Sequence, residues 1–506
     1  MKLRNIFNTL FIWGLLISSQ NSYSAETMES QRPATKAYSC KTLNKRQSFA
    51  KQVQRAHTVY EIKYDYDLQG ETALIPPDCI LKFSGGHLKN GSLVFDNTII
   101  ESPYSEVFDQ ISVSGSIANH EVRLSWWKLA YNREYNDAPL INEIISAIDN
   151  CTFYFDIQQD IFVGGGDMEG TSGEIINITD NNNLRVVQPT ENYTVLRGRS
   201  KGGHVICLSK NKYISVDGLK VDGANIYYCE QGENGIGVTG NEKVLIENCV
   251  IRNCFSDCFG KDTNGKLLKS GYPEWGAGGK GIQIEGGSVA TQVTVRNNSI
   301  RNCYIGISNN AAHQESVVMN GNYIDSCYMS IILLRLSEKI DMNVNIDNTI
   351  IANNTGDVGV ICMGNSQNVC ISNMQVRGEG KLKSVLRGCF SNSNIQMIVD
   401  QPCENLIDAA LYRDNPEGEE AVNNHVRIIS SKSCDYIINT SSSVVPKKNG
   451  ATFAKYVGGE FDVSVREGVN KTPIVLPSEN KTTQFKVRMG EVYKNGTVNT
   501  INSKKK

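Results

Sequence analysis

One pattern recurs in Val-Leu-Ile-Glu-Asn-Cys-Val-Ile at 244–251, in Val-Thr-Val-Arg-Asn-Asn-Ser-Ile at 293–300 and in Val-Asn-Ile-Asp-Asn-Thr-Ile-Ile at 344–351. Three further segments, at 214–221, 317–324 and 369–376, carry the same pattern. Each segment is anchored by an Asn or a Gly, with an apolar side chain four and two residues before it and three residues after it. The anchors are Gly218, Asn248, Asn297, Gly321, Asn348 and Asn373. Three apolar columns therefore run through six segments, as in a repeat protein.

The spacing of the anchors indicates what kind of repeat this is. Successive steps are 30, 49, 24, 27 and 25 residues, and within each segment the apolar positions alternate as they do in strands. A helical repeat would need a 3.6-residue spacing, which is missing. Asn and Gly are the residues that best tolerate a left-handed backbone between two strands. The pattern predicts an all-β parallel β-helix solenoid whose coils stack at roughly 4.8 Å.

A second stretch carries a family resemblance. The sequence Ile-Pro-Pro-Asp-Cys-Ile-Leu-Lys-Phe-Ser-Gly-Gly-His-Leu-Lys-Asn-Gly-Ser-Leu at 75–93 resembles the opening coils of β-helix proteins from polysaccharide-degrading bacteria. The repeats themselves resemble the right-handed parallel β-helix (pectate-lyase-like) superfamily. The resemblance implies a right-handed solenoid, a helix over its N-terminal end, and a polysaccharide as the partner. Residues 138–148 have helical apolar spacing with Asp137 as the expected N-cap, and are taken as that helix.

The chain divides into five parts. Lys2 and Arg4 precede an apolar run at 6–17, and small residues favour cleavage after Ser24, so residues 1–24 are predicted to be a secretory signal peptide. A polar segment follows at 25–58, then β coils with the capping helix at 59–189, the parallel β-helix at 190–440, and closing strands with a tail at 441–506. No later segment is long and apolar enough to span a membrane. We therefore expect a secreted or periplasmic protein.

The net charge bears on whether the protein binds nucleic acid, and the positions of the cysteines bear on whether they pack, form disulfides or bind a metal. The formal net charge of −2 gives no basic field to attract nucleic acid. Of the fifteen cysteines, Cys254, Cys303 and Cys327 occupy one column, six residues after their anchors. They are expected to pack as small apolar side chains, although stacked neighbours are close enough for disulfides. Metal binding by these cysteines is the least favoured interpretation.

One strand of each coil should present its outward side chains to a groove. The expected strands are 235–239, 281–285, 306–309 and 330–334. If Ile282 and Ile284 point inward, then Gln283 and Glu285 point outward. The outward positions become Ser308 and Asn310 in the next coil and Ile332 and Leu334 in the one after. Catalytic or binding side chains are therefore expected on the earlier coils, where the outward positions are polar.

The 49-residue step contains an insertion, at 255–280, that leads into the second of these strands. Long insertions in repeat proteins often form the binding face. Tyr272 and Trp275 could stack on sugar rings there, and the lysines could bind the carboxylates or sulfates of an acidic glycan. The alternative is a solvated loop whose aromatic side chains pack on the coils.

A lyase acting on a uronic-acid polysaccharide needs a cation to neutralise the carboxylate and a base to remove the adjacent proton. Lys261 or Lys280 is the candidate base, with Glu285 as a third catalytic candidate. Asp257 and Asp262 are candidate Ca²⁺ ligands, because Ca²⁺ takes oxygen ligands. Gln283, Asn310 and His313, with Tyr272 and Trp275, are the candidate binders of the polysaccharide.

Other functions stay open. A hydrolase would need a carboxylate pair, which Asp257, Asp262 and Glu285, or Glu230 and Glu233, could supply. An epimerase on the same scaffold is a further alternative. The adjacent aspartates, Gly-His-Gly and Arg-x-Lys of polygalacturonase-like enzymes do not occur, nor does the Trp-x-Asp-His of one pectate lyase group. A non-catalytic glycan-binding or adhesin role fits the same scaffold. The leading expectation is an exported protein that acts on a polysaccharide. Among the possible activities, we favour a lyase that cleaves an acidic (uronic-acid) polysaccharide by β-elimination.

Overall fold

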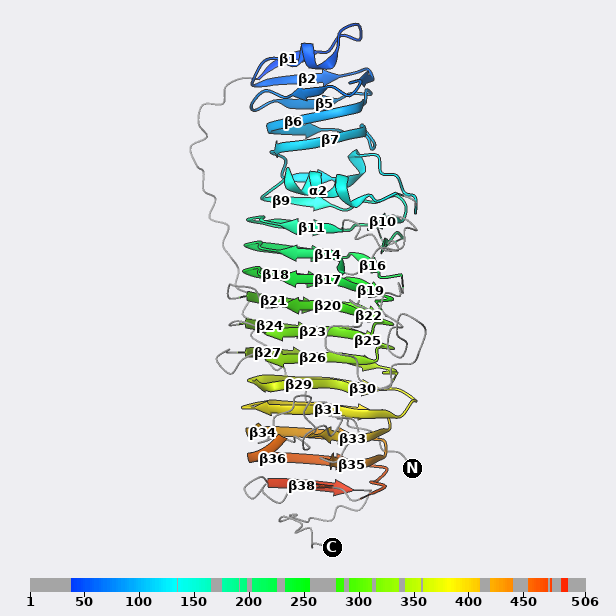
Figure 1. The fold of residues 1–506 in the computed structure, drawn as a ribbon, viewed down its shortest axis with the longest axis vertical. Helices are drawn as coiled ribbons and strands as arrows, with labels where there is room; N and C mark the ends of the chain where they lie inside the picture. The colour runs from blue at the N-terminus through cyan, green and yellow to red at the C-terminus, as the bar shows by residue number, and fades with distance from the viewer. Residues whose placement is uncertain are drawn as a thin grey trace, which may run out of the picture. The chain divides into compact units, whose positions relative to one another are not determined.

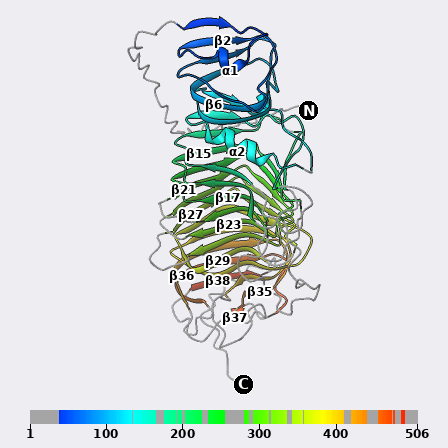
Figure 2. The ribbon, with the colours of Figure 1, turned by 45° about the horizontal axis from the view of Figure 1, so that its top comes forward.

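A computed structural model describes the chain from residue 38 to residue 489. It leaves out residues 134, 165–174, 191, 198–202, 225–232, 255–278, 286–290, 312–314, 336–341, 356–357, 410–418, 440–453, 472–473 and 476–483. The described part from Ser39 onward forms one compact unit. Parallel strands stack coil upon coil through this unit, and they form an all-β, right-handed parallel β-helix, as predicted (Figures 1 and 2).

The first coils form a sheet of their own. Among the described residues it has seven parallel strands, and a short helix, α1 (Phe49–Gln52), follows its first strand. The strands are β1 (Ser39–Thr42), β2 (Thr58–Ile62), β3 (Tyr66–Asp67), β4 (Thr72–Leu74), β5 (Ile80–Phe83), β6 (Leu88–Glu101) and β7 (Phe108–Ile117). The solenoid therefore begins inside the polar segment predicted at 25–58, one strand earlier than residue 59.

The predicted helix is α2 (Ala138–Ser146), and it lies between two strands that would otherwise be neighbours. On one side Glu143 Oε2 accepts from the Ser112 hydroxyl and from Val113 N of β7. On the other side Asn142 pairs with Ile175 O and Asn177 N, next to and within β11 (Ile176–Thr179). Two side chains thus replace the backbone bonds of a missing strand, and α2 covers the N-terminal end of the sheet that starts at β11.

The N-cap of α2 differs in one detail from the expectation. Asp137 occupies the N-cap position, but its carboxylate bonds no helix N–H. Its Oδ1 accepts from Ala130 N at 2.8 Å, and the side chain of Asn136 accepts from Ala138 N at 3.1 Å. Burial raises the pKa of Asp137. The carboxylate therefore ties the preceding loop to the helix instead of capping it.

The remaining coils share two long sheets. We call the first the long sheet; among the described residues it contains twenty strands. They are β8 (Glu121–Arg123), β9 (Cys151–Tyr154), β10 (Ile161–Val163), β12 (Leu184–Val187), β13 (Val195–Arg197), β15 (Tyr213–Asp217), β16 (Lys220–Asp222), β18 (Lys243–Glu247), β19 (Val250–Arg252), β21 (Thr291–Arg296), β22 (Ser299–Arg301), β24 (Glu315–Asn320), β25 (Tyr323–Asp325), β27 (Met342–Asp347), β28 (Ile350–Ala352), β30 (Val369–Arg377), β32 (Asn394–Asp400), β34 (Glu419–Ser430), β36 (Ala454–Val465) and β38 (Gln484–Met489). A short 3₁₀ helix, η1 (Leu124–Trp126), follows β8.

We call the second the site sheet; it contains eleven strands in the described part of the chain. They are β11, β14 (Gly203–Ser209), β17 (Glu233–Thr239), β20 (Lys280–Glu285), β23 (Ile305–Ala311), β26 (Met329–Arg335), β29 (Val358–Gln367), β31 (Leu382–Ser391), β33 (Cys403–Asp408), β35 (Cys434–Asn439) and β37 (Ile474–Val475). The groove strands predicted from the sequence are β17, β20, β23 and β26.

The predicted columns and anchors are confirmed. Val244 lies in register with Ile214 on one side and Val293 on the other, and the series continues to Val369. Each of the six anchors has a positive φ, between 49° and 77°. These left-handed residues turn the chain between the two strand segments that each coil gives to the long sheet. The apolar columns on both sides of the turn fill the core.

The prediction that the cysteine column packs as small buried side chains is also confirmed. Cys254, Cys303 and Cys327 are buried free thiols, and every cysteine in the described part of the chain is free. Burial raises the pKa of Cys303 well above its usual value. A parallel column of buried asparagines, Asn181, Asn211 and Asn241, satisfies its own amides by bonding from coil to coil. Both columns place small side chains where each coil turns.

Candidate functional site

The outer face of the site sheet, the side away from the core, carries three rows of side chains. As predicted, Ile282 and Ile284 are buried in the core, so Gln283 and Glu285 face outward. An added Cβ on Gly281 would meet the core residues Ile300 and Cys303, so the alternation is interrupted there, and Lys280 precedes this point on the outer side. The first row contains His204, Asn234, Lys280, Ile305, Met329, Val358, Ser384 and Asn405. The second contains Cys207, Gly237, Gln283, Ser308, Ile332, Ile361, Arg387 and Asp408. The third contains Ser209, Thr239, Glu285, Asn310 and Leu334.

The character of this face changes along the stack. The rows are polar through β14, β17 and β20. Strand β23 is mixed, with Ile305 in the first row and Ser308 and Asn310 in the other two, and the rows are apolar at β26 and β29. Together Ile305, Met329, Ile332, Val358 and Ile361 form a cluster separate from the core. Beyond it, β31 and β33 are polar again. The prediction that chemistry belongs to the earlier coils therefore corresponds to the first polar zone, and the second polar zone was not anticipated.

In the first polar zone the side chains form one hydrogen-bonded chain. Asn234 Nδ2 donates to Gln283 Oε1 at 2.5 Å, and Gln283 Nε2 in turn donates to Glu285 Oε1. Asn234 Oδ1 also accepts from Lys280 N at 3.0 Å. Asn234 and Gln283 are buried, whereas Glu285 is half-buried. The carboxylate of Glu285 is thus the accessible end of a chain of oriented amides.

The next coil repeats this arrangement. Ser308, which is buried, donates its hydroxyl to Asn310 Oδ1 at 3.2 Å, and Asn310 is half-buried. Glu285 and Asn310 are in register on adjacent strands, so they lie about 4.8 Å apart along the stack. In each coil a buried second-row side chain therefore holds one oxygen of its third-row neighbour. This is the supporting layer that a precise binding site needs.

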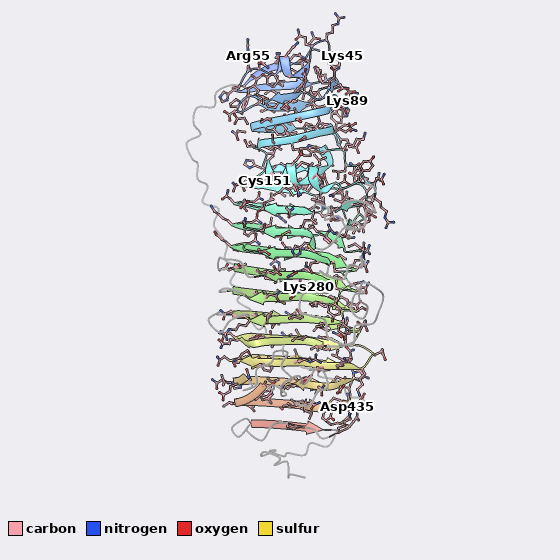
Figure 3. The ribbon with its side chains drawn as sticks, in the orientation of Figure 1. Lys45, Arg55, Lys89, Cys151, Lys280 and Asp435 are labelled. Carbon is pink, nitrogen blue, oxygen red and sulfur yellow. The ribbon has the colours of Figure 1, made fainter. Side chains whose placement is uncertain are left out.

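Lys280 and His204 complete the polar zone (Figure 3 labels Lys280). The His204 ring lies over Gly237, where an added Cβ would come within 2.4 Å of it, and Nδ1 lies 3.3 Å from Asn234 Nδ2. Burial, followed by the charges of Lys280 and Arg197, lowers the pKa of His204 to about 4. Burial also lowers the pKa of Lys280, and Glu285 opposes that shift. His204 is therefore neutral near pH 7.

Aromatic rings border the zone on the next two coils. Tyr304 and Tyr328 directly precede β23 and β26, and their rings stack with centroids 5.0 Å apart and planes 20° apart. Tyr304 is buried, and Tyr328 is half-buried. Sequence analysis placed the aromatic side chains of the site at Tyr272 and Trp275 and did not identify this pair. The signal was present, because both tyrosines directly follow cysteines of the core column.

The predicted site residues fall into two groups. Gln283, Glu285 and Asn310 lie on the outer face of the site sheet, as expected. Lys280, which the prediction assigned to the insertion, is the first residue of β20. Gln283 is only 5% exposed, so we assign it to positioning Glu285 and not to contact with a ligand. The remaining six lie outside the described residues: Asp257, Lys261, Asp262, Tyr272, Trp275 and His313.

His204 and Asn234 were missed, and their sequence gave little signal. His204 is the second residue of β14, a strand that was not among the predicted groove strands, and Asn234 is the second residue of β17, whose predicted start at residue 235 lay one position after it. Within the described part of the chain, no three His, Cys, Asp or Glu side chains are grouped so as to hold a metal ion. The Ca²⁺ site at Asp257 and Asp262 stays a prediction.

Comparison with known proteins gives little beyond the fold. No protein-family model matches the chain, and no curated protein sequence matches it. A solved structure titled "Geobacillus virus E2 - ORF18" is similar at 12% identity and a TM-score of 0.34, over 73% of this chain and 63% of that one. The receptor-binding domain of the Siphovirus 9NA tailspike is similar at 10% identity and a TM-score of 0.25, over 93% of this chain and 79% of that one. Both similarities are too distant to support a functional argument.

None of the helices in the described part of the chain has the length and the apolar character needed to cross a bilayer.

Proposed function

We propose that this parallel β-helix binds a glycan on the outer face of the site sheet, with Glu285 and Asn310 as contact residues. The observation that carries the proposal is the pair of oriented, half-buried polar groups on adjacent coils. Glu285 offers a carboxylate oxygen to sugar hydroxyl donors, and Asn310 offers an amide N–H to sugar hydroxyl acceptors. Tyr328 supplies a partly accessible ring at the other edge of the face.

The repeat of the solenoid supports a chain-like ligand. Ser209, Thr239, Glu285 and Asn310 are half-buried, in register, and one coil apart. A polymer lying along this third row would meet a hydroxyl, a second hydroxyl, a carboxylate and an amide in turn. A polysaccharide presents hydroxyl groups at regular intervals and therefore suits such a row.

A panel of neutral and uronic-acid polysaccharides, titrated calorimetrically with and without a chelator, tests this proposal. Binding to at least one polymer supports it, and the absence of binding to every member counts against it. A loss of binding in the chelator would favour the predicted Ca²⁺ site, for which Asp257 and Asp262 are the candidate ligands.

For the polymer that binds best, we expect Glu285→Ala and Asn310→Ala each to weaken binding about tenfold, and the double variant about a hundredfold. Each substitution removes one oriented hydrogen bond to the glycan. The matched control is Asn343→Ala with Asn345→Ala, two exposed amides of β27 in the long sheet. Unchanged affinity in the site variant, or an equal loss in the control, would contradict the assignment.

A second candidate function is β-elimination on a uronic-acid polysaccharide, and one observation at Lys280 favours it. Because burial lowers the pKa of Lys280, more of this amine is in the neutral form that can take a proton than in an exposed lysine. The amine would accept the proton next to the carboxylate while the glycosidic oxygen leaves. Absorbance of the unsaturated product during the same panel separates this function from binding alone, and new reducing ends without that absorbance would indicate hydrolysis.

A further inference from the structure

The first coil of the solenoid carries a dense positive charge that the proposed glycan site does not use. From residue 39 to residue 60 the chain has no Asp or Glu, but it has five Lys and Arg side chains, in a protein whose formal net charge is −2. All five are exposed. We call Lys41, Lys45, Arg46, Lys51 and Arg55 the basic cap; Figure 3 labels Lys45 and Arg55.

Buried side chains hold the backbone of the basic cap in place. Gln52, only 2% exposed, accepts from Asn44 N at 2.6 Å and donates to Asn44 O and Gln47 O at 3.0 and 2.9 Å. Phe49 of α1 is buried beneath it. These contacts fix the loop that carries Lys45 and Arg46 against α1, which carries Lys51. The cations are thus held on one ordered coil.

The cap lies at the end of the stack. β1 is the terminal strand of its sheet and pairs only with β2 among the described strands. Lys41 is in register with the buried Tyr60, so its side chain extends over the end of the core, where Nζ donates to Gln52 O at 2.6 Å. The five cations all belong to this one terminal coil, which is the outermost layer of the described stack.

No described carboxylate neutralises this layer. Glu61 is the first acid after the cap, and it pairs with Lys63 at 3.1 Å. Asp65 and Asp67 pair with His87 and Lys89 of the following coils. Lys45 lies over the Tyr64 ring, with Nζ 5.9 Å from its centroid, and so adds an aromatic ring beside the charges.

We propose that the basic cap docks the solenoid end-on against an anionic lipid bilayer. A flat layer of cations on one coil matches a flat surface of phosphate headgroups. A chain-like polyanion would instead be matched by cations repeated from coil to coil along the stack. Each cation near an anionic bilayer strengthens binding by about fivefold, and the attraction is screened by salt.

The test is co-sedimentation of the full chain with vesicles of phosphatidylcholine alone or mixed with equal parts of phosphatidylglycerol. The comparison between variants carries the test, because the apolar run at 6–17 acts on both compositions alike and Lys2 and Arg4 are present in every variant. We expect binding to the anionic vesicles to exceed binding to the neutral ones and to fall at high salt. The variant Lys45→Gln/Arg46→Gln/Lys51→Gln should lose about a hundredfold of the anionic preference.

The matched control is Lys210→Gln/Lys212→Gln/Lys243→Gln, three exposed lysines of later coils, one of which also lies over a tyrosine ring. It should keep the full preference. Equal loss in both variants, or no anionic preference at all, overturns the proposal. It is also overturned if the cap variant keeps its lipid binding but self-associates, because the cations would then protect the β1 edge from pairing. Tighter binding to a soluble acidic polysaccharide than to anionic vesicles would likewise overturn it in favour of a glycan.

Discussion

We expect the Asp408→Ala variant to lose about 3–5 kcal/mol of its free energy of unfolding, because it removes the carboxylate that balances the charge of a buried guanidinium. Asp408 Oδ2 accepts from Arg387 Nε at 2.9 Å and from the Ser384 hydroxyl at 3.1 Å. Both charged side chains have no exposed surface. They belong to the second row of the outer face, in register on β31 and β33. Urea unfolding at neutral pH measures the loss.

Two control variants show whether the loss comes from a buried charge left without its counter-charge. Asp109→Ala breaks the exposed pair with Lys128, whose side chains are 36% and 50% exposed, and should cost at most about 1 kcal/mol. The double variant Arg387→Met/Asp408→Leu removes both buried charges together and should recover most of the loss. If Asp408→Ala lowers the free energy of unfolding no more than Asp109→Ala does, the buried ion pair in the second polar zone does not stabilise the fold as predicted.

The second large effect is acid sensitivity caused by His204. Between about pH 6.5 and about pH 4, we expect the burial of this ring to lower the free energy of unfolding by about 3 kcal/mol. An unfolded imidazole takes up a proton near pH 6.5, whereas the folded one does so only at about pH 4. In that interval the unfolded state binds a proton that the folded state does not, so stability falls as the pH falls. Above pH 6.5 the two states are alike, and the effect is absent.

Unfolding of the wild type and of His204→Gln at several pH values isolates this effect. Carboxylates such as Asp149 and Asp435, whose pKa values are lowered in the folded state, also reduce stability in acid, but they are common to both proteins. The free energy of unfolding of the wild type, relative to that of His204→Gln, should therefore fall by about 3 kcal/mol from neutral pH to pH 4. A difference that is constant with pH would contradict the burial of a neutral ring next to Lys280 and Arg197.

The predictable part of the fold is the part that local rules determine. Each anchor needs a left-handed backbone, which Asn and Gly supply, and each column follows from strand alternation. The same alternation placed Gln283, Glu285 and Asn310 on the outer face. These inferences need only residues within one segment, so the 49-residue step did not disturb them.

What escaped prediction depends on contacts between coils. Asn234 meets Gln283 across 49 residues, because the insertion leaves β17 and β20 neighbours in the sheet. Alternation says that Gln283 points outward, but it does not say that the side chain is buried and orients Glu285. The ion pair of Arg387 and Asp408 likewise lies on an outward row that ordinary reasoning assigns to solvent. The role of α2 as a substitute strand depends on β7, which precedes it by a whole coil.

If a glycan lies along the outer face of the site sheet, binding of the best oligosaccharide should slow amide hydrogen exchange on that face. Exchange measured by peptide should slow in β17, β20, β23 and β26, around Glu285 and Asn310, while β18, β21 and β24 of the long sheet stay unchanged. Protection confined to the long sheet, or no protection at a saturating concentration of a ligand that binds, would rule out this binding face.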